Sequence, residues 1–256
     1  FLFKKISMKN KTIAVMGGGS WGTVLANLAA LNGSNVILWM RDLAVIEQVN
    51  TTHSNKKDLP EYKLSEKVKA TNALKEISLA DTVIFCVPSD SFREIVQSAS
   101  GHIKDSAHLI SATKGVEENG FSLMSNVIEE VLGSQRSIGV LSGPNLAGEI
   151  ALNQITGTVI ASKDKHLQNQ FIEDYSSDSF RVYISDDPYG VEMGGALKNI
   201  YAIACGIADG LNSGENTIGM IMTRGLAEMS RLAIVMGANP QTFLGLSGVG
   251  DLITTC

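Results

Sequence analysis

Short apolar runs alternate with mixed segments along most of the chain. The runs are rich in β-branched residues and end in glycine, proline or small polar residues, which is typical of strands buried in a parallel sheet. Ligands of such sheets bind outside the carboxyl ends of the strands. We expect strands at 11–16, 35–40, 82–87, 107–112 and 137–141, and two further strands at the sheet edge at 158–161 and 180–185.

Helical patterns lie between these strands and become longer after them. The sequence predicts helices at 23–31, 92–98 and 123–132. The polar stretch 51–66, which contains Pro60, is predicted to be a loop. Beyond Asp187-Pro188, two long stretches at 192–208 and 217–236 are rich in Ala, Gly, Leu, Ile and Met at helical spacing.

The predicted fold is an α/β Rossmann-like dinucleotide-binding domain at 8–188, followed by the first part of an all-α catalytic and substrate domain at 189–256. The residues before Met8 are set aside in this prediction. The sequence stops at Cys256 without a helix cap or a polar tail. We therefore expect the natural chain to be longer.

Composition excludes several classes of protein. A hydrophobic content of 44% with 18% charged residues excludes a disordered or coiled-coil chain. The net charge of −5 argues against a nucleic-acid partner and against an anionic membrane surface. No apolar run approaches the ~20 residues that a membrane span needs, so we expect no stable membrane insertion. Three widely spaced cysteines indicate reduced thiols and a cytoplasmic protein, and the apolar helical segment is compatible with a homodimer.

A glycine-rich turn follows the first predicted strand. Gly17, Gly19 and Gly22 fit the G-x-G-x-x-G pattern, between a strand and a helix of a β–α–β unit. Gly17 would permit the tight turn, Gly19 the approach of a diphosphate, and Gly22 close packing of helix on strand. The N-terminus of the helix would then face the phosphates. The alternative is a glycine-rich turn that binds nothing.

The residues after the second strand bear on the choice of cofactor. Arg41 can pair with a 2′-phosphate, which favours NADP, whereas Asp42 leaves NAD open because an acid at this point binds a ribose hydroxyl. Arg41 could also be a solvated surface charge. We expect NADP or NAD, with NADP favoured.

Two lysines are the strongest candidates for chemistry. The four histidines lie in polar surroundings without a matching acid and are interpreted as surface residues. Lys114 follows a predicted strand, and Lys198 lies within an apolar helix just after Gly194 and Gly195. Burial would lower the pKa of a lysine toward a value useful for a base. Lys198 could instead extend to solvent at the helix edge, but the neighbouring glycines indicate close backbone packing there.

The chain resembles the bacterial NAD(P)-dependent glycerol-3-phosphate dehydrogenases over about 11–256. Any one of the shared motifs is modest evidence, whereas their common order and spacing are specific. The matching motifs are 17–22, 111–115, 142–149, 190–199, 223–229 and 246–252.

This resemblance implies a role for each matching residue. Lys198 would exchange the proton of the substrate's secondary hydroxyl, while Lys114 and the amide of Asn199 would stabilise charge on the oxygen. Asp251 would contact the substrate or orient Lys198. The implied substrate-binding residues are Lys114, Gly143, Asn145, Lys198 and Asp251. The implied cofactor-binding residues are Gly17, Gly19, Ser20, Trp21, Gly22, Arg41, Lys114 and Ala147. No residue is assigned to a metal.

The implied reaction is the reversible reduction of dihydroxyacetone phosphate to sn-glycerol 3-phosphate, which supplies glycerophospholipid synthesis. Two alternatives remain: a lysine-using dehydrogenase acting on 6-phosphogluconate or a branched hydroxy acid, and a nucleotide-binding sensor without catalysis. The motifs at 143–145 and 246–252 count against the first. The joint presence of Lys114, Lys198, Asn199 and Asp251 counts against the second.

The sequence departs from the family pattern at three points. The Ser-Arg-Asn motif that binds the substrate phosphate would follow Cys256, so we expect a chain ending there to bind dinucleotide but to bind the phosphorylated substrate poorly. Asn145 stands where many members have Ser or Thr. Asp58 replaces an aromatic residue, which puts the family's cofactor contact at that loop in doubt.

Overall fold

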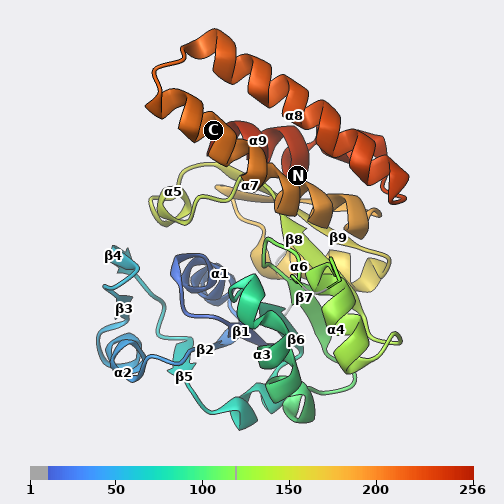
Figure 1. Ribbon diagram of the computed structural model, residues 1–256. Coiled ribbons are helices and arrows are strands. Elements are labelled where there is room, and N and C mark those ends of the chain that lie inside the picture. Colours follow the sequence, from blue (N-terminus) through green and yellow to red (C-terminus); the bar gives the residue numbers. More distant parts are fainter. Residues whose placement is uncertain (1–10, 119) are drawn as a thin grey trace.

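The computed structural model describes residues 11–118 and 120–256 and contains one eight-stranded sheet (Figure 1). Its strands are β1 (Thr12–Met16), β2 (Asn35–Trp39), β5 (Val68–Thr71), β6 (Thr82–Phe85), β7 (His108–Ser111), β8 (Ile138–Ser142), β9 (Thr156–Ser162) and β10 (Phe180–Ser185). Their order is β10-β9-β8-β7-β6-β1-β2-β5. Neighbouring strands are parallel except β8 and β9.

Helices cover both faces of the sheet because successive residues of each strand alternate between two apolar cores. Ile13 and Val15 of β1 join a core with the helices α1 and α6, whereas Ala14 and Met16 join a core with α3 and α4. The helices of this part are α1 (Ser20–Leu31), α2 (Leu43–Thr52), α3 (Phe92–Ala99), α4 (Met124–Leu132), α5 (Ala147–Ala151) and α6 (Lys165–Tyr175).

The remaining helices lie together at one end of the sheet (Figure 1). They are α7 (Pro188–Gly210), α8 (Glu215–Val235) and α9 (Asp251–Thr255), with a 3-10 helix at Pro240–Leu244 and a π-helical turn at Leu246–Gly250 between the last two. α7 packs on the sheet through Val191, which contacts the apolar cluster of Val140 and Val159. A separate core, which includes Met193, Leu197, Met229 and Phe243, joins α7 to the segments after it.

The predicted strands and helices are all present, with ends that differ by a few residues. The prediction of a loop at 51–66 is wrong, because a hairpin of β3 (Ser54–Asn55) and β4 (Leu59–Lys63) occupies much of it. Pro60 is accommodated because this hairpin is a separate two-stranded sheet with free edges. Within the described residues, no helix has the length and apolarity to span a membrane.

Candidate active site

The glycine-rich turn joins β1 to α1 in a conformation that two of its glycines make possible. Gly17 has φ of +130°, and a Cβ there would lie 2.1 Å from the carbonyl oxygen of Cys86. A Cβ on Gly22 would lie 1.9 Å from the carbonyl oxygen of Gly17. A Cβ on Gly19 would meet nothing within 4 Å, so this residue faces open space. The backbone is therefore tightly packed behind the turn and open in front of it.

A cavity of about 420 Å³ lies in front of this turn. No side chain caps the N-terminus of α1, so its first amide groups are available to an anion. The cavity and these amides fit the diphosphate of a dinucleotide. The sequence analysis did not predict that Cys86, Val87 and Pro88, which follow β6, form part of the cavity wall. They lie there because β6 is paired with β1, the strand that precedes the glycine turn. The cavity is lined by residues 17–22, Trp39, Met40, Arg41, Cys86, Val87, Pro88 and Ile95.

Arg41 and Asp42 take different positions at the rim. Arg41 is exposed and lines the cavity. Asp42 is the N-cap of α2, where it accepts hydrogen bonds from the backbone of Ala44 at 3.1 Å and Val45 at 3.3 Å. Lys57 Nζ lies 2.9 Å from Asp42 Oδ2, and this hydrogen bond lowers the pKa of Asp42. Asp42 is thus engaged within the protein, whereas Arg41 lines the cavity and forms no salt bridge with the described residues.

The second candidate site is a cluster of two lysines and one aspartate where α7 and α9 meet the sheet. Asp251 Oδ2 accepts a hydrogen bond from Lys114 Nζ at 2.5 Å, and Asp251 Oδ1 lies 3.0 Å from Lys198 Nζ. Lys198 Nζ also donates to Thr255 Oγ1 at 2.5 Å, and Lys114 Nζ to the carbonyl of Gly143 at 3.2 Å. The structure therefore brings together four predicted site residues: Lys114, Gly143, Lys198 and Asp251.

The cluster is electrostatically unusual because two ammonium groups share one carboxylate. Burial lowers the pKa of Lys114, and the charge of Lys198 lowers it further, whereas Asp251 raises it. The side chains of Lys198 and Asp251 are almost fully buried, and that of Lys114 remains 27% exposed. The excess positive charge suits an anionic substrate that approaches from the side of Lys114.

Two glycines let α7 approach this point. A Cβ on Gly194 would lie 2.6 Å from the carbonyl oxygen of Ser247, and one on Gly195 would lie 2.6 Å from Ser142 Oγ. The close packing that the sequence predicted before Lys198 is confirmed. Ser142 Oγ is buried and has no hydrogen-bond partner among the described residues. It thus lies unsatisfied next to the predicted substrate residue Gly143.

Three other predicted site residues are not drawn into the cluster by any described side-chain contact. Asn145 is turned toward β9, where it accepts from Thr158 Oγ1 at 2.8 Å and donates to the carbonyl of Gly157 at 3.3 Å. Asn199 lies on the exposed side of α7. Ala147 begins α5 and packs against the core around α1. Their binding roles stay predictions.

The loop that contains Asp58 is tied to the glycine turn through Asn55. The buried Asn55 Nδ2 donates to the carbonyl of Gly18 and to Thr23 Oγ1, both at 3.0 Å, and to Asp58 Oδ2 at 3.2 Å. This loop therefore helps to hold the glycine turn that lines the cavity, a contribution that the sequence motifs did not reveal.

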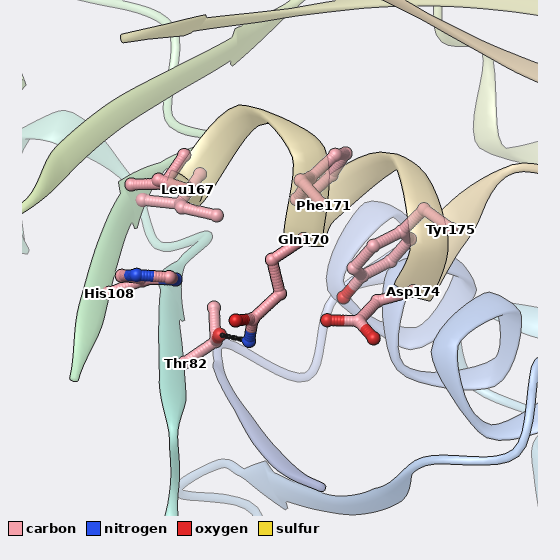
Figure 2. Close-up of a pocket in the computed structure, with 8 residues that line it drawn as sticks. Thr82, His108, Leu167, Gln170, Phe171, Asp174 and Tyr175 are labelled. Atoms are coloured by element: carbon pink, nitrogen blue, oxygen red, sulfur yellow. Dashed lines mark hydrogen bonds between the residues drawn. The ribbon is translucent and has the colours of Figure 1, made fainter. Parts of the chain in front are cut away.

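A small internal cavity at the amino ends of β6 and β7 is unrelated to either site (Figure 2). Gln170 Nε2 donates to Thr82 Oγ1 at 3.4 Å across it, and burial raises the pKa of the adjacent Asp174. The cavity has no room for a water molecule, so we interpret it as a packing defect. Within the described residues, no group of three or more His, Cys, Asp or Glu side chains could hold a metal ion.

Two family profiles match the chain. The profile of the NAD-dependent glycerol-3-phosphate dehydrogenase N-terminus matches residues 12–168, and that of the C-terminus matches residues 187–256. The chain belongs to this family. The predicted Rossmann-like fold with a helical part, and the assignment to NAD(P)-dependent glycerol-3-phosphate dehydrogenases, are thereby confirmed.

Individual members of the family resemble the chain closely. Glycerol-3-phosphate dehydrogenase [NAD(P)+] of Teredinibacter turnerae is 50% identical over 95% of this chain and 72% of the relative. The protein of the same name from Acinetobacter baylyi is 51% identical over 95% of this chain and 68% of the relative. The crystal structure of glycerol-3-phosphate dehydrogenase from Coxiella burnetii superposes with a TM-score of 0.93 at 38% identity, covering 96% of this chain and 76% of that one.

Proposed function

We propose that this chain reduces dihydroxyacetone phosphate reversibly to sn-glycerol 3-phosphate with NADPH or NADH, and that Lys198 is its acid–base residue. The observation that carries the proposal is the Lys198–Asp251–Lys114 cluster, where α7 packs on the sheet whose glycine turn borders the dinucleotide cavity and α9 packs on α7. The product would feed glycerophospholipid synthesis. We place this activity in the cytoplasm.

The cluster provides a proton acceptor, Lys198, and a residue that stabilises charge, Lys114, and both contact the carboxylate of Asp251. In the oxidative direction, the neutral amine form of Lys198 accepts the proton of the substrate's secondary hydroxyl while carbon 2 gives up a hydride; in the reductive direction the ammonium form of Lys198 returns the proton. The nicotinamide ring, when bound, supplies or accepts that hydride. Lys114 stabilises negative charge on the same oxygen, and Asp251 holds both lysine nitrogens in place.

The remaining assignments follow from the same geometry. Gly17, Gly19, Ser20, Trp21 and Gly22 would hold the diphosphate, and Arg41 would meet the 2′-phosphate of NADP. The position of Asp42 supports a preference for NADP over NAD, because Asp42 caps α2 and pairs with Lys57 and is therefore already engaged within the protein. We divide the chain into a nucleotide-binding domain at 8–188 and a helical catalytic domain at 189–256. A homodimer stays a prediction.

Replacement of Lys198 tests the proposal. In the full-length enzyme, Lys198→Ala should lower kcat for dihydroxyacetone phosphate by about 10³-fold, because it removes the proton donor. Cofactor affinity should change by less than about twofold, since Lys198 lies outside the glycine cavity. Turnover is followed at the reduced-nicotinamide absorbance, and binding by fluorescence of Trp21 and Trp39, which line that cavity.

The exposed Lys69 on β5 provides a matched control, because Lys69→Ala removes the same charge away from the cluster. That variant should retain wild-type kcat. Unphosphorylated dihydroxyacetone should be a poor substrate for the wild-type enzyme. Wild-type turnover by Lys198→Ala would refute the assigned role.

A further inference from the structure

Glu192 is a buried carboxylate that belongs to neither candidate site. It lies in the second turn of α7 and is 3% exposed. Its Oε1 accepts a hydrogen bond from the backbone N–H of Ser125 at 3.0 Å, and its Oε2 accepts one from Ser125 Oγ. A carboxylate buried to this degree is costly unless its hydrogen bonds fix something of value.

These hydrogen bonds cap a helix that has no cap of its own. α4 begins at Met124, and its N-cap residue is Leu123, whose side chain cannot accept a hydrogen bond. Glu192 therefore supplies from α7 the hydrogen-bond acceptor that the N-terminus of α4 lacks. The contact joins two helices that are 67 residues apart in sequence at this point.

The residue before the capped end of α4 pairs with the segment that follows Lys114. Val116 pairs with Leu123 in an antiparallel bridge, and the backbone N–H of Glu117 donates to the carbonyl of Ser122 at 2.8 Å. Lys114 lies two residues before this bridge, and Ser125 two residues after it. The paired residues Val116 and Leu123 therefore connect Ser125 with Lys114.

α7 meets the same segment along one line of its surface. Glu192, Gly195 and Lys198 follow one another at intervals of three residues, so they lie on neighbouring turns. At the middle position the helix comes close to the lysine, because a Cβ on Gly195 would lie 3.7 Å from Lys114 Cγ. The base of the hairpin packs into the same apolar core as Leu197. The Glu192 carboxylate is the polar anchor of this contact.

We propose that Glu192 is a positioning residue, which clamps the base of the hairpin, at Val116 and Leu123, to α7 and thereby fixes Lys114 relative to Lys198. This inference rests on the proposed function, since it concerns the same two lysines. Glu192 acts through Lys114 and touches no reacting atom. Without the clamp, Lys114 would still reach Asp251, but it would no longer be held where the substrate oxygen develops charge.

A double-mutant cycle with Lys114 distinguishes positioning from general support of the fold. Glu192→Ala should lower kcat by ~10- to 100-fold, because a misplacement of about 1 Å is enough for such a loss. The KM for the dinucleotide should stay within about twofold of wild type. In a Lys114→Ala background, the same Glu192→Ala change should have almost no further effect on kcat, because the residue through which it acts is gone.

Asp164 provides a matched control. It caps α6 and, like Glu192, accepts hydrogen bonds from the backbone at a helix N-terminus, here from His166 and Leu167, and from a serine hydroxyl, here that of Ser137. Asp164→Ala should lower the unfolding temperature as Glu192→Ala does but leave kcat at the wild-type value. Equal losses of kcat for Glu192→Ala with and without Lys114 would overturn the proposal, as would an undiminished kcat in Glu192→Ala alone.

If Glu192→Ala does not fold, Glu192→Gln replaces it in the same cycle. Its amide keeps one acceptor oxygen and nearly the same volume, so a smaller loss of kcat is expected, again only when Lys114 is present. Lys198→Ala separates this inference from the proposed function. If Lys198→Ala is inactive but the Glu192 variants keep the wild-type kcat, only the clamp is overturned. If Lys198→Ala keeps the wild-type kcat, the proposed function itself is overturned.

Discussion

At the scale of single residues, Asp251 determines how the two lysines can coexist. Each ammonium group contacts a different oxygen of this carboxylate, so neither lysine displaces the other. Removing one partner from a buried ionic group commonly costs about 3–5 kcal/mol, because the remaining charges are left uncompensated. Asp251 is therefore both a structural requirement of the cluster and the reason that two positive groups face one substrate position.

Glu192 gives the protein a pH-dependent stability whose direction follows from its burial. Burial raises its pKa from 4.5 to about 7 in the folded protein. The folded state then binds more protons than the unfolded state between these values, so this residue's contribution to stability falls as pH rises from about 4.5 to 7. The full change amounts to about 3 kcal/mol. The contribution becomes constant only at about pH 8, one unit above the folded pKa, where the carboxyl is almost fully ionised in both states.

Urea unfolding of the wild type and of Glu192→Gln, compared at several pH values between about 5 and 8, measures this contribution. Glutamine does not titrate, so the wild type should lose stability relative to the variant as the pH rises toward 7. A difference in unfolding free energy that is independent of pH would contradict the raised pKa.

The sequence could identify only part of the site at this scale. Lys114, Lys198 and Asp251 stand in motifs, and their meeting agrees with the family resemblance. Glu192 lies in the same motif as Lys198, but its partner Ser125 is remote in sequence, so no local pattern indicates the contact. The engagement of Asn145 with β9 was hidden for the same reason.

At the scale of elements, buried strands were predictable because their apolar runs are short and uninterrupted. α6 was missed, although its buried residues Leu167, Phe171 and Tyr175 recur every four positions, because polar residues dominate between them. The antiparallel direction of β9 could not be predicted, since a strand has the same apolar pattern in either direction. Strand direction depends on the connections and on the neighbours that they bring together.

The packing of α7 makes a prediction about its glycines. Alanine is the better helix former by about 1 kcal/mol, so Gly206→Ala, where a Cβ would meet nothing within 4 Å, should stabilise the protein by about that amount. Gly195→Ala should instead destabilise it by about 1–3 kcal/mol, because its Cβ would lie 2.6 Å from Ser142 Oγ. Urea unfolding measures both. Equal stabilisation by the two substitutions would show that α7 does not need the close approach.

At the scale of the whole molecule, positive side chains gather at the two sites although the chain as a whole is negatively charged. The chain carries −5 overall, yet the two sites gather Arg41, Lys114 and Lys198 at the end of the sheet where its parallel strands finish. A dinucleotide and a phosphorylated substrate are both anionic, so this local field attracts them while the rest of the surface repels nonspecific anions. Parallel strands place both sites at one edge, which is why they can share a reaction.

Cofactor choice is the property that this distribution should control most directly. Arg41 lines the cavity, and no salt bridge engages it among the described residues, whereas Asp42 is held by Lys57 and the amides of α2. Arg41→Ala should therefore raise the KM for NADPH about tenfold or more and leave that for NADH nearly unchanged, because only NADPH carries the 2′-phosphate. The proposed preference for NADPH should also decline as salt screens the contact. Lys69→Ala, which removes the same charge elsewhere, should alter neither KM. Equal losses for the two cofactors would instead place Arg41 against the diphosphate that both share.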